Sequence, residues 1–230
     1  MSAAPPRLLV VGYGRMGKLV ESLAPEYGFE PCGRVDIDNA NAPETWPQAD
    51  VAIDFSTATA VAANARALAE RGTSLVIGTT GWQAHEAELR DAVGAHPIGV
   101  VASPNFALGV NIFLAVAARA AALMATRPEY GAWIHELHHR AKIDAPSGTA
   151  IALRDAMAGA GYTATIDMAS TRVGSIPGTH TVGFDGPADT ITLTHTTRDR
   201  SLFARGALEA ARWVRGRRGW FSMNDVLGLE

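Results

Sequence analysis

The sequence is poor in the features that mark secreted and membrane proteins. Its 230 residues include a single cysteine, Cys32, which excludes an internal disulfide framework and is typical of a reducing compartment. No stretch approaches the roughly 18 continuous apolar residues of a membrane span, since the alanine-rich residues 114–125 are too few and contain Arg119. The N-terminus has no basic region ahead of a long apolar run, so no secretory signal is expected. We therefore expect a cytoplasmic protein with no membrane partner.

An excess of charge of one sign is also absent. The net charge is −3, so no overall basic field points to a nucleic-acid partner. The exception is a local cluster of arginines near the end of the chain, which we interpret as a solvated helix end. These arginines are Arg212, Arg215, Arg217 and Arg218. With 47% hydrophobic and 19% charged residues, the chain has the composition of an ordinary globular protein of one or two domains.

A glycine-rich turn follows the first apolar run. Residues 8–11 read as a buried strand, residues 12–17 have the spacing G-x-G-x-x-G, and a helical pattern comes next. In this context the first Gly permits the turn, the second lets backbone approach a pyrophosphate, and the third lets helix pack on strand. The helix start then offers free N–H groups to phosphates. The predicted cofactor-binding residues of this turn are Gly12, Tyr13, Gly14, Arg15, Met16 and Gly17.

An acidic residue stands where a dinucleotide fold places its ribose ligand. Asp36 follows a predicted strand over residues 29–35 and lies about 20 residues beyond the glycine turn. The alternative is an ordinary loop acid after a strand. Ile37 occupies the position where a basic residue would accept the 2′-phosphate of NADPH, which favours NADH, although Arg15 remains within reach of such a phosphate.

Strands and helices alternate as far as residue 106. Strands are predicted over residues 49–55, 74–77 and 98–102, with helices over 57–70 and 82–93. This alternation predicts an α/β fold, a Rossmann-type doubly wound parallel sheet that binds ligands beyond the carboxyl ends of its strands. Small polar side chains fall at that edge, and each has the alternative role of a helix N-cap. They are Asp54, Ser56, Thr79, Thr80 and Asn105.

The pattern changes after residue 106. Helices are predicted over 110–124 and 149–158, and strands over 130–138, 163–173, 179–184 and 190–196. Few helices intervene, so this part is predicted to be a separate α+β unit. A last helix over residues 202–214 suggests a return to the first domain. We therefore expect a dinucleotide-binding domain of residues 1–106 and 201–230, and a second domain of residues 107–200.

The densest group of titratable residues lies in residues 134–150, IHELHHRAKIDAPSGTA. It contains H-E-x-x-H, the zinc signature of metallopeptidases, which requires a helix. The residues before it alternate like a strand, and in a strand His135 and His139 would be roughly 13 Å apart, too far to share one metal. We therefore expect no metal.

Strand alternation gives the neighbouring histidines separate roles. His138 and His139 point to opposite faces of an extended strand, and Lys142 follows in a loop. Residues 147–149, Ser-Gly-Thr, then open a helix whose free N–H groups and hydroxyls suit a carboxylate. The alternative is a capped surface helix beside two solvated histidines. Together the cations and the helix start predict a small anionic substrate.

At this point the motifs resemble a known family. HHRAKIDAPSGTA at residues 138–150 is similar to the signature of the 4-hydroxy-tetrahydrodipicolinate reductases (dihydrodipicolinate reductases). GRMG, DFS, GTTG and SPNF stand in the family's order at residues 14–17, 54–56, 78–81 and 103–106. Near the end, Arg200, Phe203, Gly206-Ala207 and Trp213 match the family's terminal helix. The resemblance covers nearly the whole chain.

The resemblance implies an activity and the residues that carry it. It implies a cytoplasmic homotetramer in which residues 107–200 form a substrate-binding and tetramerisation domain. It also implies that the enzyme uses NADH or NADPH to reduce a cyclic imine dicarboxylate to tetrahydrodipicolinate, with loss of water from the hydroxylated substrate. It implies that His138 is the proton donor and acceptor, that Lys142 is a proton donor, and that His139, Ser147, Gly148 and Thr149 bind substrate. It extends the cofactor site to Gly78, Thr79, Thr80, Ser103, Pro104, Asn105 and Phe106.

Two departures from the family pattern bear on these expectations. Ile37 replaces a basic residue that many members carry, which bears on the choice between NADH and NADPH. Residues 171–180 are shorter than in many relatives, which bears on oligomer contacts. The alternatives are another dehydrogenase of this domain arrangement, which leaves the paired histidines unexplained, and a dinucleotide sensor without activity.

Overall fold

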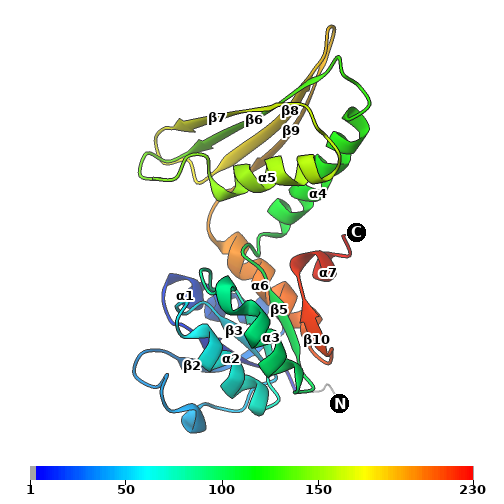
Figure 1. Cartoon of the computed structure of the whole chain (residues 1–230). Coiled ribbons are helices and arrows are strands. Elements are labelled where there is room, and N and C mark those ends of the chain that lie inside the picture. Colours follow the sequence, from blue (N-terminus) through cyan, green and yellow to red (C-terminus); the bar gives the residue numbers. More distant parts are fainter. Residues whose placement is uncertain (1–3, 230) are drawn as a thin grey trace. The chain divides into compact units, whose positions relative to one another are not determined.

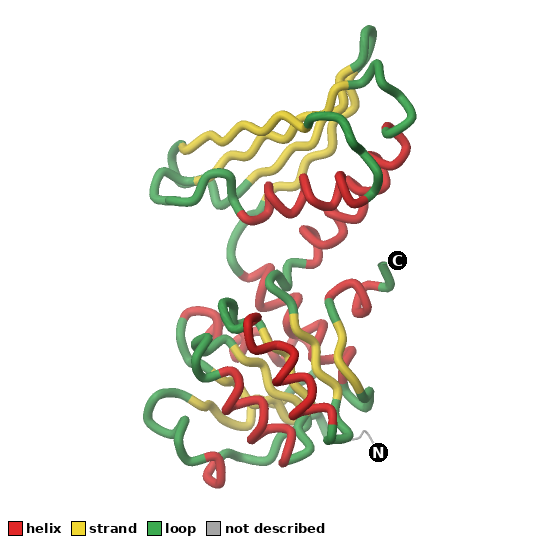
Figure 2. Tube along the Cα trace, viewed as in Figure 1, coloured by secondary structure: helices red, strands yellow, loops and turns green. Residues whose placement is uncertain are grey.

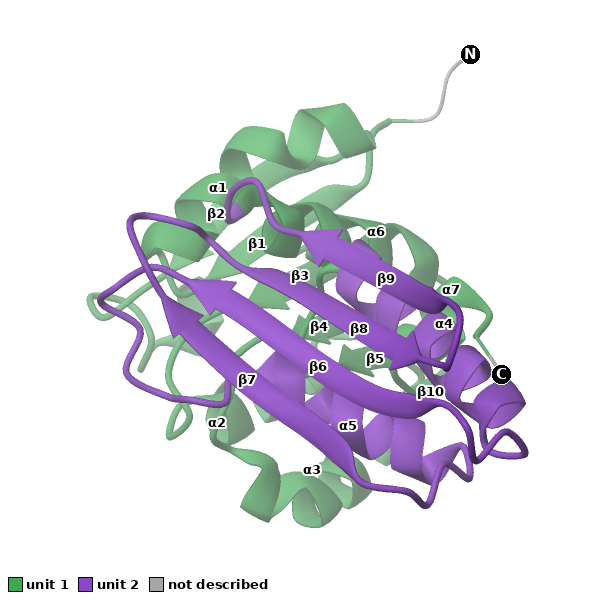
Figure 3. Cartoon of the chain, turned by 90° about the horizontal axis from the view of Figure 1, so that it is seen from above, with its two compact units in different colours: residues 1–108, 201–230 green, residues 109–200 purple. Residues whose placement is uncertain are grey.

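The computed structural model describes residues 4–229, which form two compact units (Figures 1 and 3). The first unit contains the described residues up to Leu108 together with those from Ser201 onward, and the second is Gly109–Arg200. The predicted fold class is confirmed, because the first unit is a doubly wound parallel sheet and the second is an α+β unit.

The sheet of the first unit has six parallel strands in the order β10-β5-β4-β3-β1-β2. These strands are β1 (Arg7–Val11), β2 (Glu30–Val35), β3 (Val51–Asp54), β4 (Ser74–Ile77), β5 (Gly99–Ala102) and β10 (Gly219–Phe221). The strand order reverses between β1 and β3, and ligands of such sheets bind at that switch point.

Both faces of this sheet are covered by helices. Along β1, Leu8 and Val10 face one hydrophobic core with α1 and α6, while Leu9 and Val11 face another with α2 and α3. Burial on both faces explains why β1 reads as a continuous apolar run. The helices are α1 (Arg15–Leu23), α2 (Val61–Glu70), α3 (Glu86–Gly94), α6 (Ser201–Val214) and α7 (Met223–Leu227), with short 3-10 turns at Ala24–Tyr27, Pro43–Thr45 and Gln83–His85.

The second unit is a four-stranded sheet covered on one face by two helices (Figures 1 and 2). Its strands lie in the order β7-β6-β8-β9, with β7 parallel to β6 and the other pairs antiparallel. Its elements are α4 (Leu108–Met124), β6 (Gly131–His138), α5 (Gly148–Gly159), β7 (Ile166–Arg172), β8 (Thr179–Asp185) and β9 (Thr190–Thr196).

The two faces of this second sheet differ. Ala132 and Ile134 of β6 pack with the buried residues of α4 and α5 in one core. On the opposite face, Trp133 lies over Gly183, where an added Cβ would meet the indole ring at 2.1 Å. The threonines Thr192, Thr194 and Thr196 of β9, on that same face, are exposed. This open face is thus polar at β9 and aromatic at β6.

The sequence misplaced or missed some elements. Helix α2 begins at Val61 rather than at residue 57, because Asp54 and Ser56 hold the chain in a turn first. Strand β10 and helix α7 were not predicted, since three and five residues are too short to show periodicity. Among residues 4–229, no helix has both the length and the apolar character that crossing a bilayer requires.

Candidate functional site

The glycine turn has the geometry that a dinucleotide phosphate requires. Gly12 has φ of +83°, and an added Cβ would lie 2.5 Å from the carbonyl oxygen of Phe55. A Cβ on Gly17 would lie 2.2 Å from the carbonyl oxygen of Gly12, so helix α1 packs closely on its own turn. Gly14 caps α1 without a side-chain hydrogen bond, and nothing lies within 4 Å of its Cβ position. Among residues 4–229, the first three amides of α1 donate to no acceptor, so they are available to a phosphate.

The ribose end of the expected site carries no free cation on β2. Asp36 and Ile37 follow the strand and are exposed, with Ile37 at 89%. Arg34 lies in β2, but it forms an ion pair with Glu21 at 2.7 Å and its guanidinium stacks on the Tyr13 ring at 4.0 Å. The hydrogen bond to Arg34 is the largest cause of the lowered pKa of Glu21. Asp36 thus offers a carboxylate just beyond the end of β2, and the guanidinium of Arg34 is already paired with Glu21.

The polar residues at the strand ends serve structure as well as any ligand. The buried carboxylate of Asp54 accepts hydrogen bonds from Ser56, Asn64 and Thr79 and so ties β3 to α2 and to the end of β4. The hydroxyl of Thr79 therefore points inward. Thr80 follows Thr79 and is exposed.

The SPNF segment is a turn built on its own polar groups. Ser103 Oγ donates to the carbonyl oxygen of Asn105 and accepts from the Asn105 amide. Pro104 lies between them and is exposed, whereas the ring of Phe106 is buried edge-to-face against Phe55. From this segment, Ser103 and Asn105 are thus better placed than Phe106 to offer side chains to a ligand.

In the second unit, strand alternation places two polar residues on the buried face of β6. Ala132, Ile134, Glu136 and His138 are buried, and the intervening side chains are half-buried. His139 lies just beyond the end of β6 and is partly buried, so its predicted position on the opposite strand face stays a prediction. The inner face of β6 is therefore apolar at its first two buried positions and polar at its last two.

Glu136 is a buried and ionised carboxylate. Its Oε1 accepts hydrogen bonds from Ser147 N at 3.1 Å, Ser170 Oγ at 2.7 Å and Arg172 Nη2 at 2.7 Å. Burial would raise the pKa of Glu136, but these hydrogen bonds outweigh burial and lower the pKa to about 2. The residue is therefore negatively charged at any pH near neutrality.

Two histidines face the other carboxylate oxygen. His138 Nδ1 lies 3.3 Å and His180 Nε2 lies 3.6 Å from Glu136 Oε2, and the two rings meet edge-to-face at 5.1 Å. Burial is the main cause of the lowered pKa of His138. Burial and the neighbouring His138 lower the pKa of His180 to about 4, so that His180 is neutral near pH 7. Burial is thus the main cause of the lowered pKa of both histidines.

Within residues 4–229, Glu136, His138 and His180 form a group of potential metal-ligand atoms within 4.8 Å of one another. The Arg172 guanidinium already neutralises the carboxylate, and a second cation beside it would be repelled. The structure thus places different residues together from those of the H-E-x-x-H motif, since His135 faces Thr171 at 2.9 Å. We interpret the group as a hydrogen-bonded ionic cluster.

The start of α5 lies next to this cluster. Ser147 caps the helix by accepting from Ala150 N, and its Oγ lies 3.0 Å from His180 Nε2. The amides of Gly148 and Thr149 have no acceptor among residues 4–229, and Gly148 is exposed. Their N–H groups and the positive end of the helix are available to an anion.

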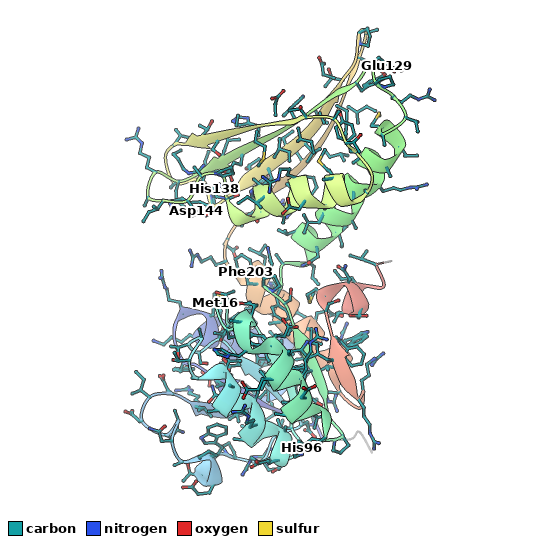
Figure 4. All side chains as sticks on the ribbon, viewed as in Figure 1. Met16, His96, Glu129, His138, Asp144 and Phe203 are labelled. Carbon is teal, nitrogen blue, oxygen red and sulfur yellow. The ribbon has the colours of Figure 1, made fainter. Side chains whose placement is uncertain are left out.

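Lys142 and Asp144 lie in the loop between β6 and α5. Lys142 Nζ donates to both carboxylate oxygens of Asp144, at 2.7 and 2.8 Å, and this contact lowers the pKa of Asp144. Figure 4 shows His138 and Asp144 at the same end of the sheet, and Glu129 at the opposite end. The structure thus gathers the predicted His138, Lys142, Ser147, Gly148 and Thr149 at one end of the second unit.

Three members of the cluster were not predicted from sequence. In the sequence Glu136 stands out only as part of the H-E-x-x-H motif, and Arg172 and His180 belong to no motif. Arg172 pairs with His138, and His180 with Glu136, across neighbouring strands. A usable signal was present, because His180 continues the inward alternation of the apolar Val182 and Phe184.

Family models match both parts of the chain. The model described as "Dihydrodipicolinate reductase, N-terminus" matches residues 6–106, and "Dihydrodipicolinate reductase, C-terminus" matches residues 109–227. A protein named 4-hydroxy-tetrahydrodipicolinate reductase from Acidiphilium cryptum (strain JF-5) is 40% identical over 251 residues, and the match covers 100% of this chain and 100% of the relative. One of the same name from Christiangramia forsetii (strain DSM 17595 / CGMCC 1.15422 / KT0803) is 33% identical, with 96% of this chain and 97% of the relative covered.

Solved structures share the fold. A dipicolinate-bound dihydrodipicolinate reductase from Paenisporosarcina sp. TG-14 matches with a TM-score of 0.81 at 21% identity, covering 95% of this chain and 97% of the other. An inositol dehydrogenase homolog complexed with NAD+ from Azotobacter vinelandii matches with a TM-score of 0.55 at 13% identity, covering 99% and 90%. Dehydrogenases of other substrates therefore share the arrangement of strands and helices.

Proposed function

The chain belongs to the dihydrodipicolinate reductase family, and we propose that His138 and Lys142 move the protons of its reaction while the start of α5 holds a carboxylate of the substrate. The reaction is the NAD(P)H-dependent reduction of 4-hydroxy-tetrahydrodipicolinate to tetrahydrodipicolinate in the diaminopimelate route to lysine. The observation that carries the proposal is that His138 and Asp144 lie at the same end of the second sheet (Figure 4), that Lys142 is hydrogen-bonded to Asp144, and that the start of α5 follows this loop.

The first unit fits the nicotinamide cofactor. When bound, NAD(P)H supplies the hydride that reduces the conjugated cyclic imine. Gly12, Gly14 and the open N–H groups of α1 are suited to its pyrophosphate, and Asp36 to a ribose hydroxyl. We assign the remaining cofactor contacts to the turn residues and to the strand ends. They are Tyr13, Arg15, Met16, Gly17, Gly78, Thr79, Thr80, Ser103, Pro104, Asn105 and Phe106.

The second unit is suited to a small dicarboxylate. One carboxylate group accepts hydrogen bonds from the amides of Gly148 and Thr149 and from the Thr149 hydroxyl. Ser147 holds this helix start in place through its capping bond and its contact with His180. His139 and Lys142 add donors from the end of β6 and from the following loop. The dipicolinate bound by the Paenisporosarcina relative is a compound of this class and supports the assignment.

A proton must be delivered as hydride adds to the substrate, because the reduced ring gains one hydride and one proton. His138 is suited to this because imidazole is the side chain whose ordinary pKa lies nearest to neutrality, and His138 ends the strand that leads into the Lys142 loop. Lys142 is a second proton carrier, and Asp144 holds its ammonium group. The loss of water from the hydroxylated substrate needs a proton on the departing hydroxyl and a base that takes the proton from the neighbouring ring carbon, and we assign both tasks to the same pair.

We expect the purified protein to oxidise NADH when it is supplied with substrate freshly made by the preceding synthase, and to oxidise NADPH less efficiently. Asp36 and Ile37 offer a 2′-phosphate no cation, and Arg34 is held by Glu21. Ile37→Arg should therefore raise kcat/KM for NADPH about tenfold, a change equal to one modest charge-assisted contact. Arg66→Lys on the exposed side of α2 is the matched control. Equal use of both cofactors by the wild type, or an unchanged preference in Ile37→Arg, would remove Asp36 and Ile37 as the determinants.

We also propose a cytoplasmic homotetramer assembled through the open face of the second sheet. That face exposes the threonines of β9 and carries Trp133 flat over Gly183, leaving one side of the sheet without covering helices. Light scattering of the purified protein is expected to give four chain masses, and Trp133→Glu to give a smaller species. A wild-type mass of one chain at micromolar concentration would contradict the proposal.

A further inference from the structure

We propose that Glu136 is a positioning residue for both the proton donor and the carboxylate pocket. One carboxylate oxygen holds the start of α5 in place, and the other orients the His138 ring. The proposal deepens the proposed function, since it rests on the role of His138 in proton transfer. In this role the buried carboxylate of Glu136 exchanges no proton with the substrate and acts through its neighbours.

The two oxygens of Glu136 have separate partners. Three donors converge on Oε1, one from α5 and two from β7, namely Ser147 N, Ser170 Oγ and Arg172 Nη2. No donor reaches Oε2 among residues 4–229, although the residue is fully buried. A buried carboxylate oxygen without a partner is rare and destabilising, so a partner is expected at that position.

The facing atom of His138 is in the same condition. His138 Nδ1 is also buried without a hydrogen bond among residues 4–229, and it lies 3.3 Å from Glu136 Oε2. A small rotation of the ring completes a bond in which Nδ1–H donates to the carboxylate. On the other side of the ring, Nε2 lies next to Gly178, which leaves room there because a Cβ at that position would come within 3.0 Å of Nε2. The geometry thus selects the tautomer that carries its proton on Nδ1 and leaves Nε2 for exchange with substrate.

Charged and titratable groups reach His138 from each element packed against it. The charged groups are Glu136 on β6, Lys142 and Asp144 in the following loop, and Arg172 on β7. The uncharged group is His180 on β8. The carboxylates raise the pKa of His138, and the two cations lower it. Because Glu136 is the nearest of these charges, its removal should lower the pKa of His138 further.

Glu136→Gln keeps the shape of the side chain and its ability to accept a hydrogen bond from Ser147, but removes the charge. We expect kcat to fall about 100-fold, within the range of general acid catalysis, while KM changes less than about threefold. We also expect the alkaline limb of the kcat–pH profile to move to lower pH, because an acid of lower pKa loses its proton earlier. Ser170→Ala is the matched control, since it removes one hydrogen bond to Glu136 without changing charge, and its pH profile should stay in place.

Glu136→Asp restores the charge on a shorter side chain and should return the alkaline limb toward its wild-type position. An unmoved limb in folded Glu136→Gln, with the wild type active, would overturn the positioning role and leave the proposed function intact. An inactive wild type would overturn the proposed function itself.

A measurement on the wild type covers the case in which the variants do not fold, since Glu136→Gln leaves Arg172 beside a neutral side chain. Histidine-selective ¹⁵N labelling reports which ring nitrogen of each of the seven histidines carries the proton. The His138 signal, identified by its loss in a His138 variant, is expected to show protonated Nδ1 and unprotonated Nε2 above neutral pH. Protonated Nε2 would overturn the proposal.

Discussion

Replacing His138 with glutamine is expected to lower kcat by about 10²- to 10⁴-fold, the range over which general acid–base catalysis contributes to enzymatic rates. Glutamine fills a similar volume and can hydrogen-bond to Glu136, but it cannot exchange a proton with the substrate. The measurement is the rate of NADH oxidation at saturating substrate across pH. The variant should also lose the alkaline limb of the pH profile, since the group that titrates there is gone.

His135→Gln is the matched control for this experiment. His135 lies on the same strand, on the opposite face from His138, where it contacts Thr171. Its kcat should remain within about twofold of the wild type. If His138→Gln keeps most of its activity and its alkaline limb, the proton comes from another group, and Lys142 becomes the first candidate.

The parts of the site that were predictable from sequence are those made within one short segment. The glycine turn needs only a strand, three glycines and a helix start, all within residues 8–17. The helix start at Ser147 is likewise local, because its cap and its open amides lie within four residues. The face of His138 follows from strand alternation alone. Each of these expectations depends on geometry that the backbone repeats wherever the pattern occurs.

Patterns within one short segment could not predict the ionic cluster around Glu136. Its partners Arg172 and His180 come from strands that lie 36 and 44 residues further along the chain, and only the register of the sheet brings them to Glu136. Alternation along one strand indicates which side chains point inward, as it does for His180, but it does not say which residue of the neighbouring strand lies opposite, since a shift of two residues keeps the same face inward. The H-E-x-x-H motif drew attention to Glu136 for the wrong reason, since its helix geometry does not apply to β6.

Helix α6 was only partly predictable from the sequence. Its apolar periodicity predicted the helix, but its close packing depends on a distant loop. A Cβ on Gly206 would lie 1.6 Å from the carbonyl oxygen of Phe106, so this glycine is required by a contact across about one hundred residues of sequence. The sequence shows the glycine, and only the folded chain shows the contact.

Replacing Thr149 with valine is expected to weaken inhibition by pyridine-2,6-dicarboxylate about tenfold to a hundredfold. Valine has the shape of threonine, so the helix start is preserved and the hydroxyl donor is lost. A hydrogen bond to a charged group contributes roughly 1.5–3 kcal/mol, which corresponds to this range of affinity. Thr163→Val, an exposed threonine beyond the other end of α5, is the matched control and should leave the inhibition constant unchanged.

The central claim is that the start of α5 binds the acid of the substrate while His138 supplies the proton beside it. The inhibition constant of pyridine-2,6-dicarboxylate against substrate, compared between wild type and Thr149→Val, tests this claim most directly, because the planar diacid carries both carboxylates and undergoes no reaction. We predict competitive inhibition of the wild type and an inhibition constant raised at least tenfold in the variant. Competitive inhibition of equal strength in both proteins would show that the carboxylate binds elsewhere and would contradict the account.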